Sequence, residues 1–64
     1  MFIVYFLKNK KSNLIQIGFT EDLTETHEYL NQKFKTKLLL VSQEKYKSKK
    51  DAMIRVKQLK NKIN

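Results

Sequence analysis

Residues 2–7 read Phe-Ile-Val-Tyr-Phe-Leu, and this run decides the fold of the chain. Almost all of its side chains are β-branched or aromatic, which favours a β-strand. Apolar residues occupy both the odd and the even positions, a pattern that is typical of a strand covered on both faces. We therefore expect residues 2–7 to form the central strand of a sheet.

A second strand follows after a short polar segment. Residues 8–13 are polar and prone to form turns, and the apolar pattern resumes in residues 14–19 with three apolar residues on one parity. The two strands predict a hairpin with a charged tip. Gly18, the only glycine, lies inside the second strand, where glycine commonly marks a bulge or a close approach of the backbone.

A helix is expected next. Thr20 is placed to cap it, since its hydroxyl can accept a hydrogen bond from a free amide of the first turn. Glu21 and Asp22 follow, where carboxylates stabilise the positive end of the helix dipole. We expect the helix to end between residues 32 and 35. Its buried stripe is thin and comprises Leu23, Leu30 and Phe34.

Two further segments complete the pattern. Residues 38–41 form a short apolar run, Leu-Leu-Leu-Val, which indicates a third, buried strand. Ser48 and Asp51 match the capping box that starts a helix, with Asp in place of the usual Glu. The helix that follows carries one apolar stripe at helical spacing, made of Ala52, Val56, Leu59 and Ile63.

The predicted order is therefore β-β-α-β-α. We expect a small single α+β domain over residues 1–64, with a three-stranded antiparallel sheet and two helices. A chain of 64 residues has a marginal core, and without cysteine it has no disulfide or cysteine metal site to reinforce it. Self-association consequently stays open as a source of stability.

The apolar runs are too short for a membrane span. The longest covers residues 2–7, whereas a bilayer needs about 20 apolar residues. No basic segment precedes this run as it would in a secretory signal. We expect a cytoplasmic location without membrane contact.

Charge is concentrated in the second half of the chain. Residues 33–64 hold eleven of the 14 basic residues and two of the six acidic ones. This asymmetry favours a polyanion as partner, although a merely solvated lysine-rich surface remains the alternative. Because all basic residues except Arg55 are lysine, backbone phosphate contacts are favoured over sequence-specific readout.

The candidate contacts fall into three groups. One alternates along the approach to the third strand, one crowds the loop before the last helix and the start of that helix, and one flanks the core stripe of that helix. An aromatic residue inside the second group is a candidate for stacking on an unpaired base. The groups are Lys33, Lys35 and Lys37; Lys45, Tyr46, Lys47, Lys49 and Lys50; and Lys57 and Lys60.

Several short motifs are placed in a familiar order. Ile3-Val4-Tyr5 and Gln16-Ile17-Gly18-Phe19-Thr20 resemble the two signature strands of the GIY-YIG nuclease superfamily, particularly its small stand-alone bacterial members. Weaker matches extend the resemblance over most of the chain and imply the same α+β fold. They are Asp22-Leu23, Asn31, Ser48, Ala52, Leu59 and Lys60.

The resemblance also implies that the catalytic set is degenerate. Family members use a tyrosine in each signature strand, an arginine on the first helix and a metal-binding glutamate on the last. Tyr5 retains the first tyrosine, whereas Gln16, Thr26 and Val56 stand at the other three positions. Loss of the cation and the metal ligand removes the largest electrostatic contributions to phosphoryl chemistry. We expect no enzyme activity, no metal and no cofactor, with Tyr5 as a relic or simply a core residue.

Some alternatives remain open. A rearranged catalytic site would have to draw on Tyr5, Glu25, His27, Glu28 and Glu44. The leading hypothesis is an inactive GIY-YIG-like domain that binds DNA or RNA through its lysine-rich half. The second hypothesis is a small regulatory or interaction module, of a phage-type or accessory kind, that binds an acidic protein or itself through Met53 and Ile54.

Overall fold

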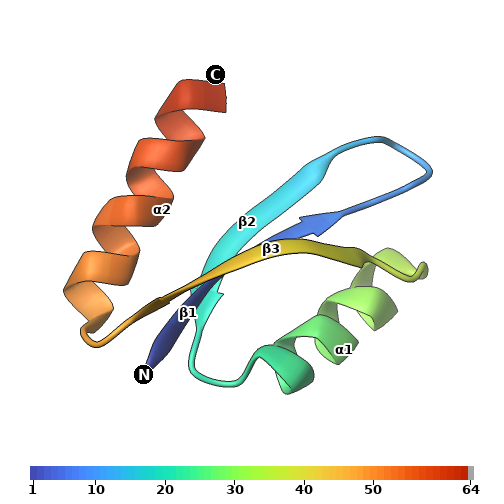
Figure 1. The fold of residues 1–64 in the computed structure, drawn as a ribbon. Coiled ribbons are helices and arrows are strands. Elements are labelled where there is room, and N and C mark those ends of the chain that lie inside the picture. The colour runs from blue at the N-terminus through green and yellow to red at the C-terminus, as the bar shows by residue number, and fades with distance from the viewer. Residues whose placement is uncertain (64) are drawn as a thin grey trace.

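Strand β1 (Phe2–Lys8) lies at the centre of one antiparallel sheet, between β2 (Ile15–Thr20) and β3 (Leu39–Tyr46). Along the chain, helix α1 (Leu23–Phe34) lies between β2 and β3, and α2 (Lys49–Ile63) is the last element (Figure 1). This computed structural model describes residues 1–63, with side chains through residue 61. The predicted α+β class and the order β-β-α-β-α are confirmed.

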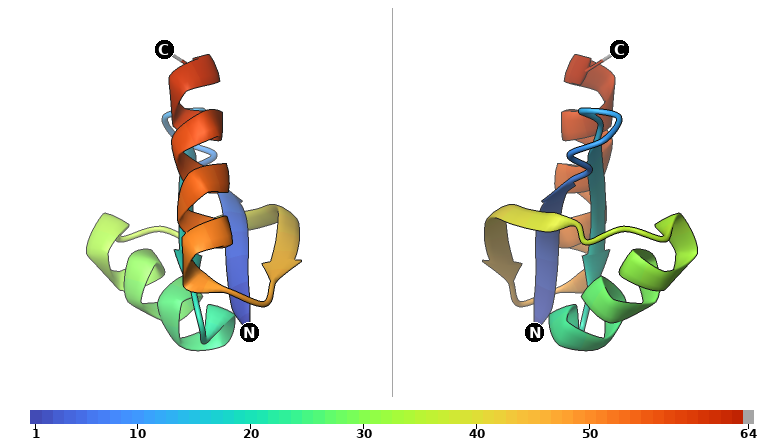
Figure 2. Two further views of the ribbon diagram at one scale, coloured as in Figure 1. Left: turned by 90° about the vertical axis from the view of Figure 1, so that its left-hand side faces the viewer. Right: turned by 90° about the vertical axis from the view of Figure 1, so that its right-hand side faces the viewer.

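The two helices cover opposite faces of the sheet (Figure 2). Val4 packs with α2, in a cluster that includes buried Ala52 and Val56. The next residue along the strand, Tyr5, packs with Leu30 of α1 in a second cluster. The central strand is thus buried on both sides, which explains why residues 2–7 are apolar at both parities.

The apolar stripe of α2 contacts the sheet as expected. Ala52 and Val56 are buried and Leu59 packs partly against the same cluster, while the side chain of Ile63 lies outside the described residues. Ser48 begins the helix, since its hydroxyl accepts a hydrogen bond from the backbone N–H of Asp51 at 3.1 Å. Within residues 1–63 no helix is both long and apolar enough to cross a membrane.

Strand β3 is longer than the sequence predicted and begins one residue later, and the expectation that it is buried is wrong, because its apolar residues 39–41 are exposed. Its polar half continues to pair with β1, up to the partners Tyr46 and Phe2. The expectation that Lys45 lies in a loop is therefore wrong, because Lys45 pairs with Ile3. An edge strand that is largely exposed needs few apolar residues, so its polar half carried no strand signal.

The start of α1 also differs from the expectation. Asp22, not Thr20, is the N-cap, and its carboxylate accepts from the backbone N–H of Glu25 at 3.0 Å. The Thr20 hydroxyl instead accepts from the backbone N–H of Asp22 and pairs with the hydroxyl of Thr26 at 2.7 Å. At the other end, Lys35 closes the helix with a left-handed φ of 52°, within the predicted range.

Gly18 has a steric role that differs from a bulge. Its φ is not positive, and the pairing of β1 with β2 runs through it without a shift. Tyr5 is its partner across the strands, and a Cβ atom at position 18 would lie 2.7 Å from Cζ of that ring. The glycine therefore leaves room for a buried tyrosine, which is a close approach by a side chain rather than by backbone.

Candidate nucleic-acid interface

The four positions at which the family resemblance places catalytic groups are not gathered in one site. Tyr5 is buried on the face covered by α1, where desolvation raises the pKa of its hydroxyl. Gln16 is exposed in β2, and Thr26 of α1 is bonded to Thr20. Val56 lies in the core on the opposite face of the sheet. A glutamate at that position would be separated from Tyr5 by the sheet itself.

The groups considered for a rearranged catalytic site are also divided. Glu25, His27 and Glu28 lie on α1, whereas Glu44 contacts Arg55 of α2. Among the described residues, no three His, Cys, Asp or Glu side chains come together in a way that could hold a metal ion. No local pattern in the sequence signals this separation, because it depends on which face of the sheet each helix covers.

His27 and Asn31 together bind the backbone of one residue. The Nε2 atom of His27 lies 2.6 Å from the carbonyl oxygen of Leu38, and the Leu38 N–H donates to Oδ1 of Asn31 at 2.8 Å. Since a carbonyl only accepts, Nε2 carries the proton in this hydrogen bond. The side chain of Leu38 is buried beside Leu30 and Tyr5. The histidine therefore has a structural role in joining α1 to the start of β3.

The hydrogen bond from the Leu38 N–H to Asn31 predicts that Asn31→Ala destabilises the fold. The variant leaves a partly buried Leu38 N–H without its acceptor, which costs about 1–3 kcal/mol of unfolding free energy. Gln32→Ala is the matched control, because it removes a neighbouring, exposed amide from the same helix. Urea unfolding at neutral pH measures both. Equal stability of the two variants would contradict this role of Asn31.

Tyr46 is engaged within the protein. Its hydroxyl donates to Oε1 of Glu44 at 2.7 Å, and its ring packs against the α2 side of the core. Arg55 binds the same carboxylate with Nε at 2.9 Å and Nη2 at 3.1 Å. These contacts hold Tyr46, which was expected to stack on an unpaired base, against the protein's own sheet and helix. They also lower the pKa of Glu44, mainly through Arg55 and then through Tyr46.

The lowered pKa predicts how Glu44→Gln responds to pH. A carboxylate with a depressed folded pKa stabilises the fold above its ordinary value of 4.5 and loses that effect as pH falls through the folded value. The variant should therefore be less stable than wild type at pH 7, and the difference should shrink below pH 4.5. Denaturant unfolding across this range measures it, with Glu28→Gln as the control for loss of one negative charge. A difference that is independent of pH would contradict the account.

The candidate lysines lie at opposite ends of β3. One group precedes the strand and the other surrounds its junction with α2, so the strand separates them by about 24 Å. Lys57 and Lys60 are exposed farther along α2. We call the group at the β3–α2 junction the junction lysines: Lys45, Lys47, Lys49 and Lys50.

Three lysines from the first half of the chain lie near the first group. Lys8 pairs with Leu39, so the tip of the β1–β2 hairpin lies at the same end of the sheet as the segment between α1 and β3. We call the six lysines at this end the hairpin-end lysines: Lys8, Lys10, Lys11, Lys33, Lys35 and Lys37. Antiparallel pairing of the first and third strands was the signal that could have found them.

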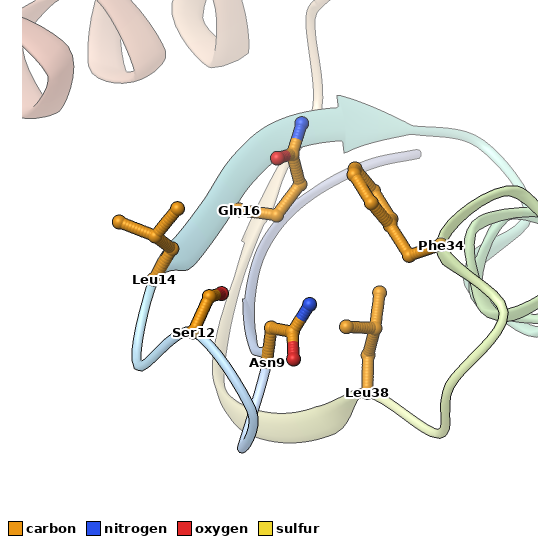
Figure 3. A pocket seen from close by; sticks show the side chains of 6 residues that line it. All are labelled: Asn9, Ser12, Leu14, Gln16, Phe34 and Leu38. Carbon is orange, nitrogen blue, oxygen red and sulfur yellow. The ribbon is translucent and has the colours of Figure 1, made fainter.

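A hollow of about 180 Å³ lies between the hairpin and the end of α1 (Figure 3). Phe34 lines it and is 41% exposed, so the expectation that this residue belongs to the core is wrong. The buried stripe of α1 ends at Leu30 because the chain turns away at Lys35, and Leu38 fills the core instead. The other lining residues are Asn9, Ser12, Leu14, Gln16 and Leu38.

Met53 and Ile54 lie exposed on α2, at 41% and 46% respectively. Neither belongs to the stripe that packs on the sheet. Both side chains are thus uncovered, which is what binding of a protein partner there would require. Whether a partner or a second copy binds them stays a prediction.

Comparisons with protein-family models, with curated proteins and with solved structures found no match to this chain. The resemblance to the GIY-YIG superfamily therefore rests on the residues and on the order of elements. The three-stranded α+β fold itself is shown by the structure.

Proposed function

We propose that this domain binds nucleic acid through its lysines without cutting it. The observation that carries the proposal is the gathering of the hairpin-end lysines around one end of the sheet. Five of them are exposed and Lys8 is half-buried. Within residues 1–61 the one salt bridge joins Arg55 to Glu44, so no lysine described there has an ion-pair partner. Such a surface attracts phosphate backbones without regard to sequence.

The position of the acidic residues supports this choice of surface. Glu21, Asp22 and Glu25 line a shallow depression at the start of α1. Along the helix axis Glu25 lies about 12 Å before Lys33, and Glu28 lies about 7.5 Å before it. Asp51 and Glu44 lie near the junction lysines instead. The hairpin end therefore combines six lysines with one nearby carboxylate, that of Glu28, whereas the four junction lysines lie near two, those of Glu44 and Asp51.

The absence of cleavage is part of the same proposal. We regard the chain as a degenerate relative of the GIY-YIG superfamily, in which Gln16, Thr26 and Val56 replace the second tyrosine, the arginine and the metal-binding glutamate. The burial of Val56 and its separation from Tyr5 support this interpretation. We also propose a cytoplasmic location, which the shortness of the apolar runs supports.

Two charge-reversal variants test the binding surface. Lys10→Glu/Lys11→Glu/Lys35→Glu should weaken binding to a labelled single-stranded oligonucleotide at least about tenfold and lower the salt slope by about 2, since each lost contact contributes about 0.7. The matched control carries the same charge change at Lys47, Lys49 and Lys50 and should weaken binding less. Fluorescence anisotropy over a salt series measures both.

The same titrations address cleavage and the proposal as a whole. With Mg²⁺ present, a denaturing gel should show intact oligonucleotide. Wild-type binding is expected with a Kd on the order of 10⁻⁴ to 10⁻⁶ M at physiological salt. Undetectable wild-type binding at low salt, or equal weakening by both triple variants, would contradict the proposed surface.

A protein-interaction module is the second candidate function. The exposure of Met53 and Ile54 on neighbouring positions of α2 favours it. An acidic protein partner or a second copy would cover these apolar side chains. Because neither residue lies at the hairpin end, the two functions are separable by mutation.

A further inference from the structure

We propose that the hollow beside Phe34 receives one unpaired nucleobase, so that the domain prefers single-stranded or unpaired nucleic acid to a regular duplex. This inference rests on the proposed nucleic-acid binding and adds the class of ligand to it.

The size and position of the hollow suit one ring system. Its volume of about 180 Å³ is below the roughly 300–1,000 Å³ of pockets for drug-sized ligands. Figure 3 shows Asn9, Ser12, Leu14 and Gln16 of the hairpin on one side, with Phe34 and Leu38 on the other. A flat, mostly apolar group would thus be held between two parts of the chain.

Phe34 provides the stacking surface. The residue is 41% exposed, and the apolar area that it leaves in water would be covered by a base. Lys33 adds a cation, since its Nζ atom lies 6.0 Å from the ring centroid. An aromatic ring accompanied by a lysine is the combination that single-strand binders use for bases and phosphates.

The polar groups around the hollow are neutral and suit the edge of a base. Gln16 has both an amide donor and an amide acceptor, and within the described residues no hydrogen bond occupies its side chain. Asn9 accepts from the backbone N–H of Lys11 at 3.0 Å, which leaves its NH₂ group to donate. Ser12 adds a hydroxyl, and no carboxylate lines the hollow. A base is therefore favoured over a cationic ligand.

The lysines identify the ligand as part of a nucleic-acid strand. Lys10 and Lys11 lie between Asn9 and Ser12 in the chain, Lys35 follows Phe34, and Lys37 precedes Leu38. Phosphates on either side of an inserted base would meet ammonium groups from both walls. A base inside a regular duplex is stacked and paired, so it cannot enter the hollow without disruption of the helix.

The test compares Phe34→Ala with Phe34→Trp and Tyr29→Ala. Tyr29 is an exposed aromatic on the same helix but lines the acidic depression, which makes it the matched control. Loss of stacking in Phe34→Ala should weaken binding to a single-stranded oligonucleotide about tenfold, with duplex binding changed less than about twofold. Phe34→Trp should keep single-strand affinity, and Tyr29→Ala should change neither.

Three results would overturn the inference. They are an equal effect of Phe34→Ala on single strands and duplex, no effect on either, and binding of free AMP as tight as binding of the oligonucleotide. The last result would assign a mononucleotide site instead. If wild type binds single strands and duplex in a lysine-dependent manner while Phe34→Ala has no effect, the base site fails and the proposed function stands. If wild type binds no nucleic acid at all, the proposed function fails as well.

Discussion

The hydrogen bonds from α1 to the backbone of Leu38 are the constraint on which the proposed binding surface depends. His27 and Asn31, one helical turn apart, bind the carbonyl and the N–H of this residue. The Leu38 side chain is meanwhile buried against the sheet. Because the backbone of Leu38 is held from one side and its side chain from the other, the segment after α1 has little freedom. Phe34 and Lys35, just before that segment, are therefore held opposite the hairpin.

The two faces of the sheet at β1 are packed differently. The face toward α2 carries a continuous apolar cluster, with Glu44, Arg55 and Tyr46 forming a polar contact beside it. The apolar cluster on the face toward α1 has fewer members, and the hollow lies beside it at the hairpin end of the sheet. The larger apolar cluster and the hollow thus lie on opposite faces of the sheet. This division also explains why Tyr5 and Val56 cannot belong to one site.

The elements that the sequence predicted are those with strong local signals. Residues 2–7 are apolar at both parities, and the stripe of α2 has helical spacing, so both could be placed without knowledge of the rest. The polar half of β3 could not, because an edge strand carries no apolar pattern. Phe34 could not either. Helical spacing alone places it beside Leu30, and only the left-handed turn at Lys35 shows that the core ends earlier.

The candidate surface was less predictable than the fold, because its lysines come from segments that are far apart in the sequence and lie close together only in the folded chain. The hairpin lysines are offset in sequence by four carboxylates in residues 21–28, yet Glu21, Asp22 and Glu25 lie at the start of α1, away from the hairpin end. The most direct test is an NMR titration of ¹⁵N-labelled protein with a single-stranded oligonucleotide. The account predicts that chemical-shift changes gather at residues 9–16 and 33–38. Changes centred on Met53 and Ile54, or no changes at low salt, would contradict it.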